Sequence, residues 1–200
     1  MNVYTSVQST SADTEQDSCI RFYGVSWEQF EAIEAAFKDI RGVKFLYLDR
    51  ILQIMTVSPE HEIIKKTLCM LLEAYMRANK IRFYAKGGPT LGNRELGGRK
   101  EPDDSYDIGT EKTVPDIAIE VVITSGGINT LELYKRVGVR EVWFWQNSQL
   151  AIYYLIDENY EQIARSRFLP DLNLELLVRC ANMPDQYDAV TELLANISPV

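Results

Sequence analysis

The segment of residues 115–123, with the sequence PDIAIEVVI, constrains the fold of this chain more than any other. Apolar residues occupy both of its faces, which is typical of a central strand that is covered on each side. Glu120 interrupts the apolar run, and burying an unpaired carboxylate costs on the order of several kcal/mol. The segment therefore predicts a central strand over residues 116–124, with a cation or a metal ion beside Glu120.

A second acidic segment, residues 103–108, predicts the antiparallel neighbour of this strand. In a hairpin centred on the intervening turn, Asp103 lies opposite Glu120 and Asp107 lies opposite Asp116. Opposed Cβ atoms are about 5 Å apart, and like charges at that separation are unfavourable without a cation between them. Hard oxygen ligands of this kind favour Mg²⁺ or Mn²⁺. The alternative is a solvated surface hairpin, which leaves Glu120 unexplained.

Helices and strands alternate through the rest of the chain and indicate an α/β domain with a mixed central sheet. Two helix starts carry clear signals, a capping box at Ser26 and Gln29 and an N-cap with a first-turn proline at Ser58 and Pro59. We expect a polar N-terminal arm over residues 1–20 and a single domain over 21–200. The other expected helices are 126–137 and 187–194, and the other expected strands are 43–48, 51–57, 81–85, 141–146 and 150–156, with strand or extended chain at 162–168 and 172–178.

Composition excludes several kinds of chemistry. The 200 residues include three cysteines and one histidine, so zinc sites built from thiolates and imidazoles are ruled out. Any serine or cysteine nucleophile would depend on His61, which leaves carboxylates to carry acid–base or metal chemistry. No apolar run is long enough to span a membrane and the first residues do not resemble a signal peptide. We therefore expect no membrane partner and a cytoplasmic location.

The charge of the chain is unevenly distributed. The net charge is −8, yet residues 41–100 hold twelve basic against five acidic side chains. Phosphate binding needs only a local basic patch, so this segment makes DNA a candidate partner. The alternative is that these side chains merely solvate a helix and a loop. The candidate DNA contacts, taken together as a patch, are Lys65, Lys86, Arg94, Arg99 and Lys100.

The spacing from Pro102-Asp103 to Glu120 resembles the first two acidic elements of the PD-(D/E)XK nuclease superfamily. Three blocks together more closely resemble the Uma-two family of restriction-endonuclease-like bacterial proteins: Ser58–Glu62, Pro115–Val121 and Tyr134–Trp143. The resemblance implies a restriction-endonuclease-like core, in the order α-β-β-β-α-β, with an added N-terminal helix and C-terminal strands. It also implies hydrolysis of DNA phosphodiester bonds by an endonuclease that uses Mg²⁺ or Mn²⁺.

The resemblance also implies roles for particular residues. Asp103 and Glu120 would hold the metal ion, and Asp116 would be a further acidic member of the catalytic set. Glu62 would be an extra ligand or would orient the attacking water, whereas His61 beside it is as well explained as a helix-start residue. By analogy, a homodimer would let one active site serve each strand of a duplex.

The sequence departs from the pattern of these relatives at the catalytic lysine. The resemblance implies that the PD-(D/E)XK superfamily has this lysine at the position of Val122, and that the Uma-two family has it at the position of Thr130. A cation would then have to come from Lys86 or from the loop of residues 94–100. This departure keeps a second hypothesis open, a degenerate nuclease fold that binds DNA or a protein partner without cleavage. A carboxylate-pair hydrolase acting on sugars fits the predicted hairpin less well.

The aromatic run Trp143–Trp145 admits two interpretations. Beside a predicted hairpin it is better explained as core packing than as a surface on which bases stack.

Overall fold

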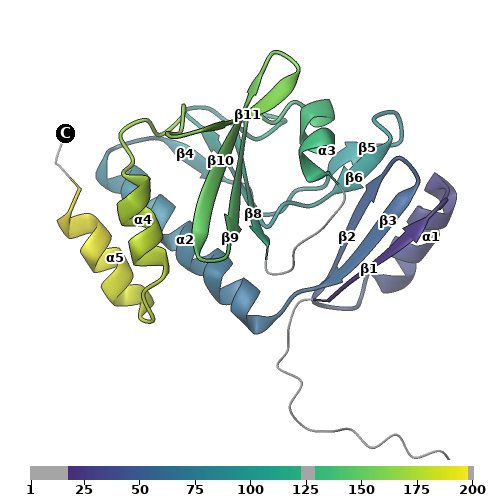
Figure 1. The fold of residues 1–200 in the computed structure, drawn as a ribbon, viewed down its shortest axis with the longest axis horizontal. Coiled ribbons are helices and arrows are strands. Elements are labelled where there is room, and N and C mark those ends of the chain that lie inside the picture. The colour runs from purple at the N-terminus through teal and green to yellow at the C-terminus, as the bar shows by residue number, and fades with distance from the viewer. Residues whose placement is uncertain (1–17, 123–128, 198–200) are drawn as a thin grey trace, which may run out of the picture.

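The chain forms two β-sheets with helices around them (Figure 1). This computed structural model describes residues 18–122 and 129–197. The predicted strand end at 123–124 and helix start at 126–127 lie outside the described residues, as does most of the predicted N-terminal arm. Residues 18–20, which we expected in that arm, belong to a strand.

The first sheet has five strands in the order β1-β3-β2-β6-β5. Its strands are β1 (Ser18–Tyr23), β2 (Val43–Leu48), β3 (Ile51–Thr56), β5 (Leu91–Asn93) and β6 (Gly98–Lys100). Helix α1 (Trp27–Phe37) lies against one face of this sheet, where Phe30 packs on Tyr47 and Leu52. The predicted capping box starts this helix, because the Ser26 side chain accepts from Gln29 N–H and the Gln29 side chain accepts from Ser26 N–H.

The second sheet has six strands in the order β11-β10-β9-β8-β7-β4. Its strands are β4 (Phe83–Ala85), β7 (Asp104–Ile108), β8 (Ile117–Val122), β9 (Glu141–Gln146), β10 (Gln149–Ile156) and β11 (Asn159–Ile163). Strand β8 is central, antiparallel to β7 and parallel to β9. Its residues from 117 to 121 are all buried, as the apolar run predicts.

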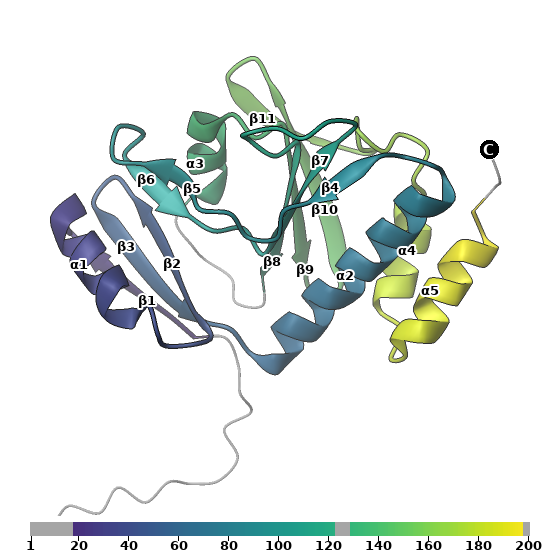
Figure 2. The ribbon, with the colours of Figure 1, turned by 180° about the vertical axis from the view of Figure 1, so that it is seen from behind.

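The main hydrophobic core lies between this sheet and three helices, α2 (Pro59–Ala78), α4 (Leu174–Ala181) and α5 (Gln186–Ala195) (Figure 2). Trp143 and Trp145 of β9 point into it, which confirms the core-packing interpretation for these two rings. Helix α3 (Thr130–Val137) covers part of the opposite face, where Tyr134 packs on Ala118 and Val142. This helix ends at Gly138, whose φ of 91° permits the left-handed cap.

The expected fold class is confirmed. Helix α2, strands β4, β7 and β8, helix α3 and strand β9 occur along the chain in the order α-β-β-β-α-β, with β5 and β6 of the other sheet inserted between β4 and β7. Helix α1 precedes this core, strands β10 and β11 follow it, and the central sheet is mixed. None of the helices in the described residues is long and apolar enough to cross a membrane.

Of the two segments expected near the C-terminus as strand or extended chain, 172–178 is wrong and 162–168 is a strand only as far as Ile163. Residues 172–178 have alternating leucines, but Asn173 caps a helix by accepting from Leu176 N–H at 3.0 Å, so that Leu176, Leu177 and Cys180 face the core. In the segment 162–168 the strand ends at Ile163, and Ser166 Oγ accepts from the N–H groups two and three residues later, which turns the chain. Tertiary packing decided both cases against the local pattern.

Strands β5 and β6 were also missed, because we interpreted the glycine-rich segment 86–100 as a loop. Its glycines allow close backbone approach. A Cβ on Gly92 would lie 2.2 Å from the carbonyl oxygen of Gly98.

We therefore expect Gly92→Ala to destabilise the fold more than Gly109→Ala. Both glycines have left-handed backbones, with φ of +88° and +82°, but nothing lies within 4 Å of a Cβ on Gly109. The left-handed conformation alone costs an alanine about 1–2 kcal/mol, and only the Gly92 variant adds a backbone clash. Urea unfolding of both variants measures the difference, and equal losses would contradict the close approach seen between β5 and β6.

Candidate active site

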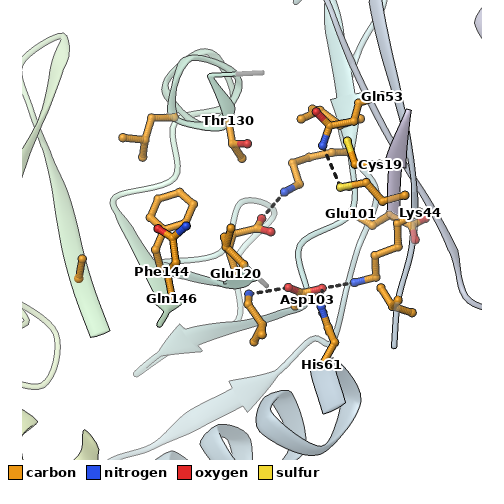
Figure 3. Close-up of a pocket in the computed structure, with 18 of the residues that line it drawn as sticks. Cys19, Lys44, Gln53, His61, Glu101, Asp103, Glu120, Thr130, Phe144 and Gln146 are labelled. Atoms are coloured by element: carbon orange, nitrogen blue, oxygen red, sulfur yellow. Dashed lines mark hydrogen bonds and ion pairs between the residues drawn. The ribbon is translucent and has the colours of Figure 1, made fainter. Parts of the chain in front are cut away.

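The hairpin register predicted from the two acidic segments is confirmed. Asp104 pairs with Ile119 and Ser105 with Ala118, and one step further the N–H of Asp103 donates to the carbonyl of Ile119 at 3.1 Å. Asp103 Oδ2 accepts from the N–H of Val121 at 2.7 Å, which fixes its carboxylate next to that of Glu120 (Figure 3). We call Asp103 and Glu120 the carboxylate pair.

Two cationic or titratable side chains contact Asp103. Lys44 of β2 forms an ion pair with its Oδ1, and His61 Nε2 of α2 lies 3.0 Å from the same oxygen. His61 is 4% exposed and its backbone N–H donates to Ser58 Oγ, so the N-terminal turn of α2 positions the imidazole. Asp103 therefore links the two sheets to the start of α2.

Glu120 has a different set of partners. Lys100 of β6 forms an ion pair with its Oε1, and the hydroxyl of Tyr134 on α3 donates to the same oxygen. The Lys100 ammonium also lies 5.1 Å from the centre of the Tyr134 ring. A lysine from the five-stranded sheet thus reaches the carboxylate that neither Val122 nor Thr130 can neutralise.

The two carboxyl groups are pushed in opposite directions. Burial raises the pKa of Glu120, and Lys100 opposes this shift without cancelling it, while the nearby charge of Asp103 adds to it. Burial would also raise the pKa of Asp103, but the His61 hydrogen bond and the Lys44 charge outweigh it and hold that pKa well below its usual range. Such a separation of two adjacent acids is typical of functional sites.

The carboxylate pair faces a cavity of about 640 Å³ between the two sheets. One wall is the inner face of the five-stranded sheet, including Lys44 and Gln53. The other is formed by β8, β9 and β10, with Phe144 and Gln146 beside Glu120 (Figure 3). Thr130 of α3 lies at the same cavity.

The other predicted acidic residues lie elsewhere. Asp116 Oδ2 accepts from the N–H of Ile108 at 2.7 Å and pairs with the Lys112 ammonium, so it holds the β7–β8 turn together. Asp107, opposite it, accepts from the N–H of Lys112 at 2.7 Å. Glu62 pairs with Lys65 at 2.6 Å and lines a separate, neighbouring hollow. The carboxylate of Asp107 is thus neutralised by Lys86, and that of Asp116 by Lys112.

Each member of the expected DNA-binding patch is paired with an acidic side chain. Lys86 lies 3.2 Å from Asp107, and Lys65 is held by Glu62. Arg94 pairs with Glu28 in the first turn of α1, and Arg99 pairs with Glu34 further along that helix. Lys100 pairs with Glu120. The five side chains come from three separate parts of the molecule, so the structure does not gather them into one surface.

Sequence reasoning missed two members of the site, Lys44 and Tyr134, and it named Lys100 only as a candidate DNA contact within the 94–100 loop from which a cation could come. Lys100 could be named only as one of several basic residues in a loop, because the β6 strand that delivers it was not recognised. Tyr134 belongs to one of the blocks that carry the family resemblance, and this was the available signal for it.

The family model of Uma2, described as "Putative restriction endonuclease", matches residues 27–183. The chain belongs to the Uma2 family. The match covers α1, the whole α-β-β-β-α-β core and the residues of the carboxylate pair. A comparison with the sequences of curated proteins finds no match.

We expect Lys44→Met to raise the pKa of Asp103. The wild-type carboxylate, with its lowered pKa, stabilises the fold at pH values above the usual Asp range, and this contribution is lost as the pH falls through the folded-state pKa. Removing the Lys44 charge should move that loss to higher pH, by about one unit or more. Carboxyl-carbon NMR titration measures it directly. Lys38→Met, which replaces an exposed lysine that does not line the main cavity, is the matched control, and equal titration curves in all three proteins would contradict the assigned role of Lys44.

Proposed function

We propose that this Uma2 protein is a metal-dependent endonuclease that hydrolyses DNA phosphodiester bonds. The observation that supports it most is the carboxylate pair, two buried acids brought together by hairpin register at the edge of a cavity. Two like charges buried side by side need positive partners, which Lys44 and Lys100 supply in this structure and which a divalent ion would supply in the proposed reaction. The family description points to the same reaction class.

The donor chemistry fits a divalent ion. Mg²⁺ is commonly bound by one or two carboxylates, with water and substrate phosphate completing its coordination, so two carboxylates suffice. No group of three or more acidic, histidine or cysteine side chains gathers in the described residues, and the proposed ligands are the two acids of the carboxylate pair. When bound there, Mg²⁺ or Mn²⁺ polarises the phosphate and lowers the pKa of a coordinated water.

The surrounding side chains suggest how the protein itself contributes. The Lys100 ammonium, 4% exposed as a side chain, is placed to offset charge that develops on a phosphate beside Glu120. Tyr134 donates to Glu120 and orients its carboxylate, while His61 and Val121 N–H orient Asp103. Lys44 keeps Asp103 ionised and thus ready to bind a cation.

Among the remaining candidates we assign supporting roles. Asp116 stabilises the turn that sets the hairpin register. Glu62 is close enough to raise the pKa of Lys44 but does not line the main cavity, so we place it behind the site. DNA is the proposed substrate.

Glu120→Gln is expected to reduce DNA cleavage by at least about a hundredfold, since it removes a ligand charge and leaves Lys100 unpaired. The assay is nicking of supercoiled plasmid with Mg²⁺ or Mn²⁺. Glu101→Gln is the matched control, because Glu101 lines the same cavity but is exposed and bonds to Thr90. Cleavage that survives Glu120→Gln would show that the activity does not come from this site.

Lys100→Met should lower the cleavage rate by about 10²–10³-fold, the usual effect of losing one group that stabilises developing charge. If Lys100 replaces the lysine that relatives carry at the position of Thr130, then Thr130→Lys in the Lys100→Met background should recover part of the rate. Lys66→Met, an exposed lysine on α2, should leave it unchanged. A fully active Lys100→Met variant would remove Lys100 from the mechanism.

A degenerate nuclease fold is the second candidate. It is favoured by the ion pairs themselves, because Lys44 and Lys100 already neutralise the carboxylate pair in the absence of metal. Plasmid DNA that is bound but never nicked, with any divalent ion, would favour this candidate over the first.

A further inference from the structure

An aromatic ring stands directly beside the carboxylate pair. Phe144 of β9 is the register partner of Glu120 on β8, and both side chains lie on the face of the sheet that borders the cavity. Alternation along β9 sends Trp143 and Trp145 to the other face, into the α2 core. Adjacent strands are about 4.8 Å apart, so Phe144 lies within one nucleotide's reach of any phosphate held at Glu120.

Phe144 packs partly against the hydrophobic cluster that includes Tyr134 and Val142, and it also lines the cavity. Its partner on β10 is Ala151, which has almost no side chain, and Tyr153 meets it edge-on, with ring centres 5.7 Å apart at 82°. Phe144 is half-buried, unlike the two tryptophans on either side of it. The arrangement supplies an aromatic face that a flat group can stack on.

Amide side chains border this ring. Gln146 and Gln149 face each other across β9 and β10, and Gln162 pairs with Tyr153 from β11. All three line the cavity. An amide offers both a donor and an acceptor, which suits the edge of a nucleobase. An apolar face with a few polar groups around it is the usual form of a small-molecule or single-nucleotide pocket.

The site is poorly suited to an intact duplex. The acids of the carboxylate pair are only 7% and 8% exposed, and the cavity between the sheets has the volume of a pocket for one compact ligand. Duplex binding relies on rows of lysine and arginine contacts to phosphate, yet the five side chains of the expected DNA-binding patch are each paired with an acid of this chain. Single strands bind instead through stacking on aromatic rings.

We propose that the substrate of this site is single-stranded or locally unpaired DNA, with the base next to the scissile phosphate stacked on Phe144. The inference rests on the proposed nuclease function for its chemistry, but the stacking itself needs no metal. Gln146 is placed to contact the edge of the stacked base, and Lys100 lies on the phosphate side of the ring.

Binding and cleavage are measured separately. Fluorescence anisotropy in EDTA compares a labelled strand of about twelve nucleotides with the same strand annealed to its complement. We expect the single strand to bind at least about tenfold more tightly, and Phe144→Ala to weaken its binding by roughly five- to a hundredfold, the usual effect of losing one stacked base. Phe144→Tyr keeps the ring and should bind as the wild type does.

The matched control is Phe37→Ala. Phe37 is also half-buried and also has one edge-on aromatic neighbour, Phe45, but it lies on α1 away from the cavity. This variant should leave binding within about twofold of wild type, and circular dichroism confirms that both alanine variants are folded. Equal or tighter binding of the duplex, or unchanged binding by Phe144→Ala, would overturn the inference.

Cleavage of the same two DNAs with Mn²⁺ distinguishes this inference from the proposed function. Single-strand binding that depends on Phe144, without cleavage, supports the stacking site and contradicts the nuclease. Cleavage of the duplex as fast as the single strand supports the nuclease and contradicts the stacking site.

Discussion

The site depends on one arrangement of charge: two buried carboxylates on adjacent antiparallel strands, each paired with a lysine from the other sheet. Neither carboxylate would stay ionised without its lysine, because an unpaired buried charge costs on the order of several kcal/mol. Together they bring the five-stranded and six-stranded sheets into contact through β2 and β6. Binding of a divalent ion would therefore change the contacts between the sheets as well as the charge of the site.

Under the proposed function, Lys100 supplies the cation that neither Val122 nor Thr130 provides. What a phosphoryl-transfer site needs is a cation close to the reacting phosphate, and the strand that supplies it is free to vary. Lys100 is delivered by β6, a three-residue strand built from a glycine-rich segment. Gly92 lets β5 approach β6 closely, and Gly98 lets β6 approach the Tyr47 carbonyl of β2 and leaves room for Leu133 of α3. The close packing that these glycines allow therefore places Lys100 at the site.

Much of the structure was predictable from local patterns. The apolar run of β8 predicted a central strand, and the position of the acids in the two segments predicted the hairpin register, because a strand has only two faces. The same reasoning could not predict Lys44 or Lys100, since their proximity to the acids arises from packing between sheets that share no sequence pattern. It also failed for α4, where a cap at Asn173 and contacts with the core overrode an alternating run of leucines. The fold-level prediction was confirmed by the family match, whereas the roles of individual residues remain proposals.

Direct observation of a metal ion is the sharpest test of the central claim. A crystal of the wild-type protein soaked in Mn²⁺ would give an anomalous difference peak wherever the ion binds. We predict a peak between the carboxylates of Asp103 and Glu120, with the ammonium groups of Lys44 and Lys100 moved off the oxygens that they contact in this structure. A peak at another place, or none while both ion pairs stay intact, would contradict it.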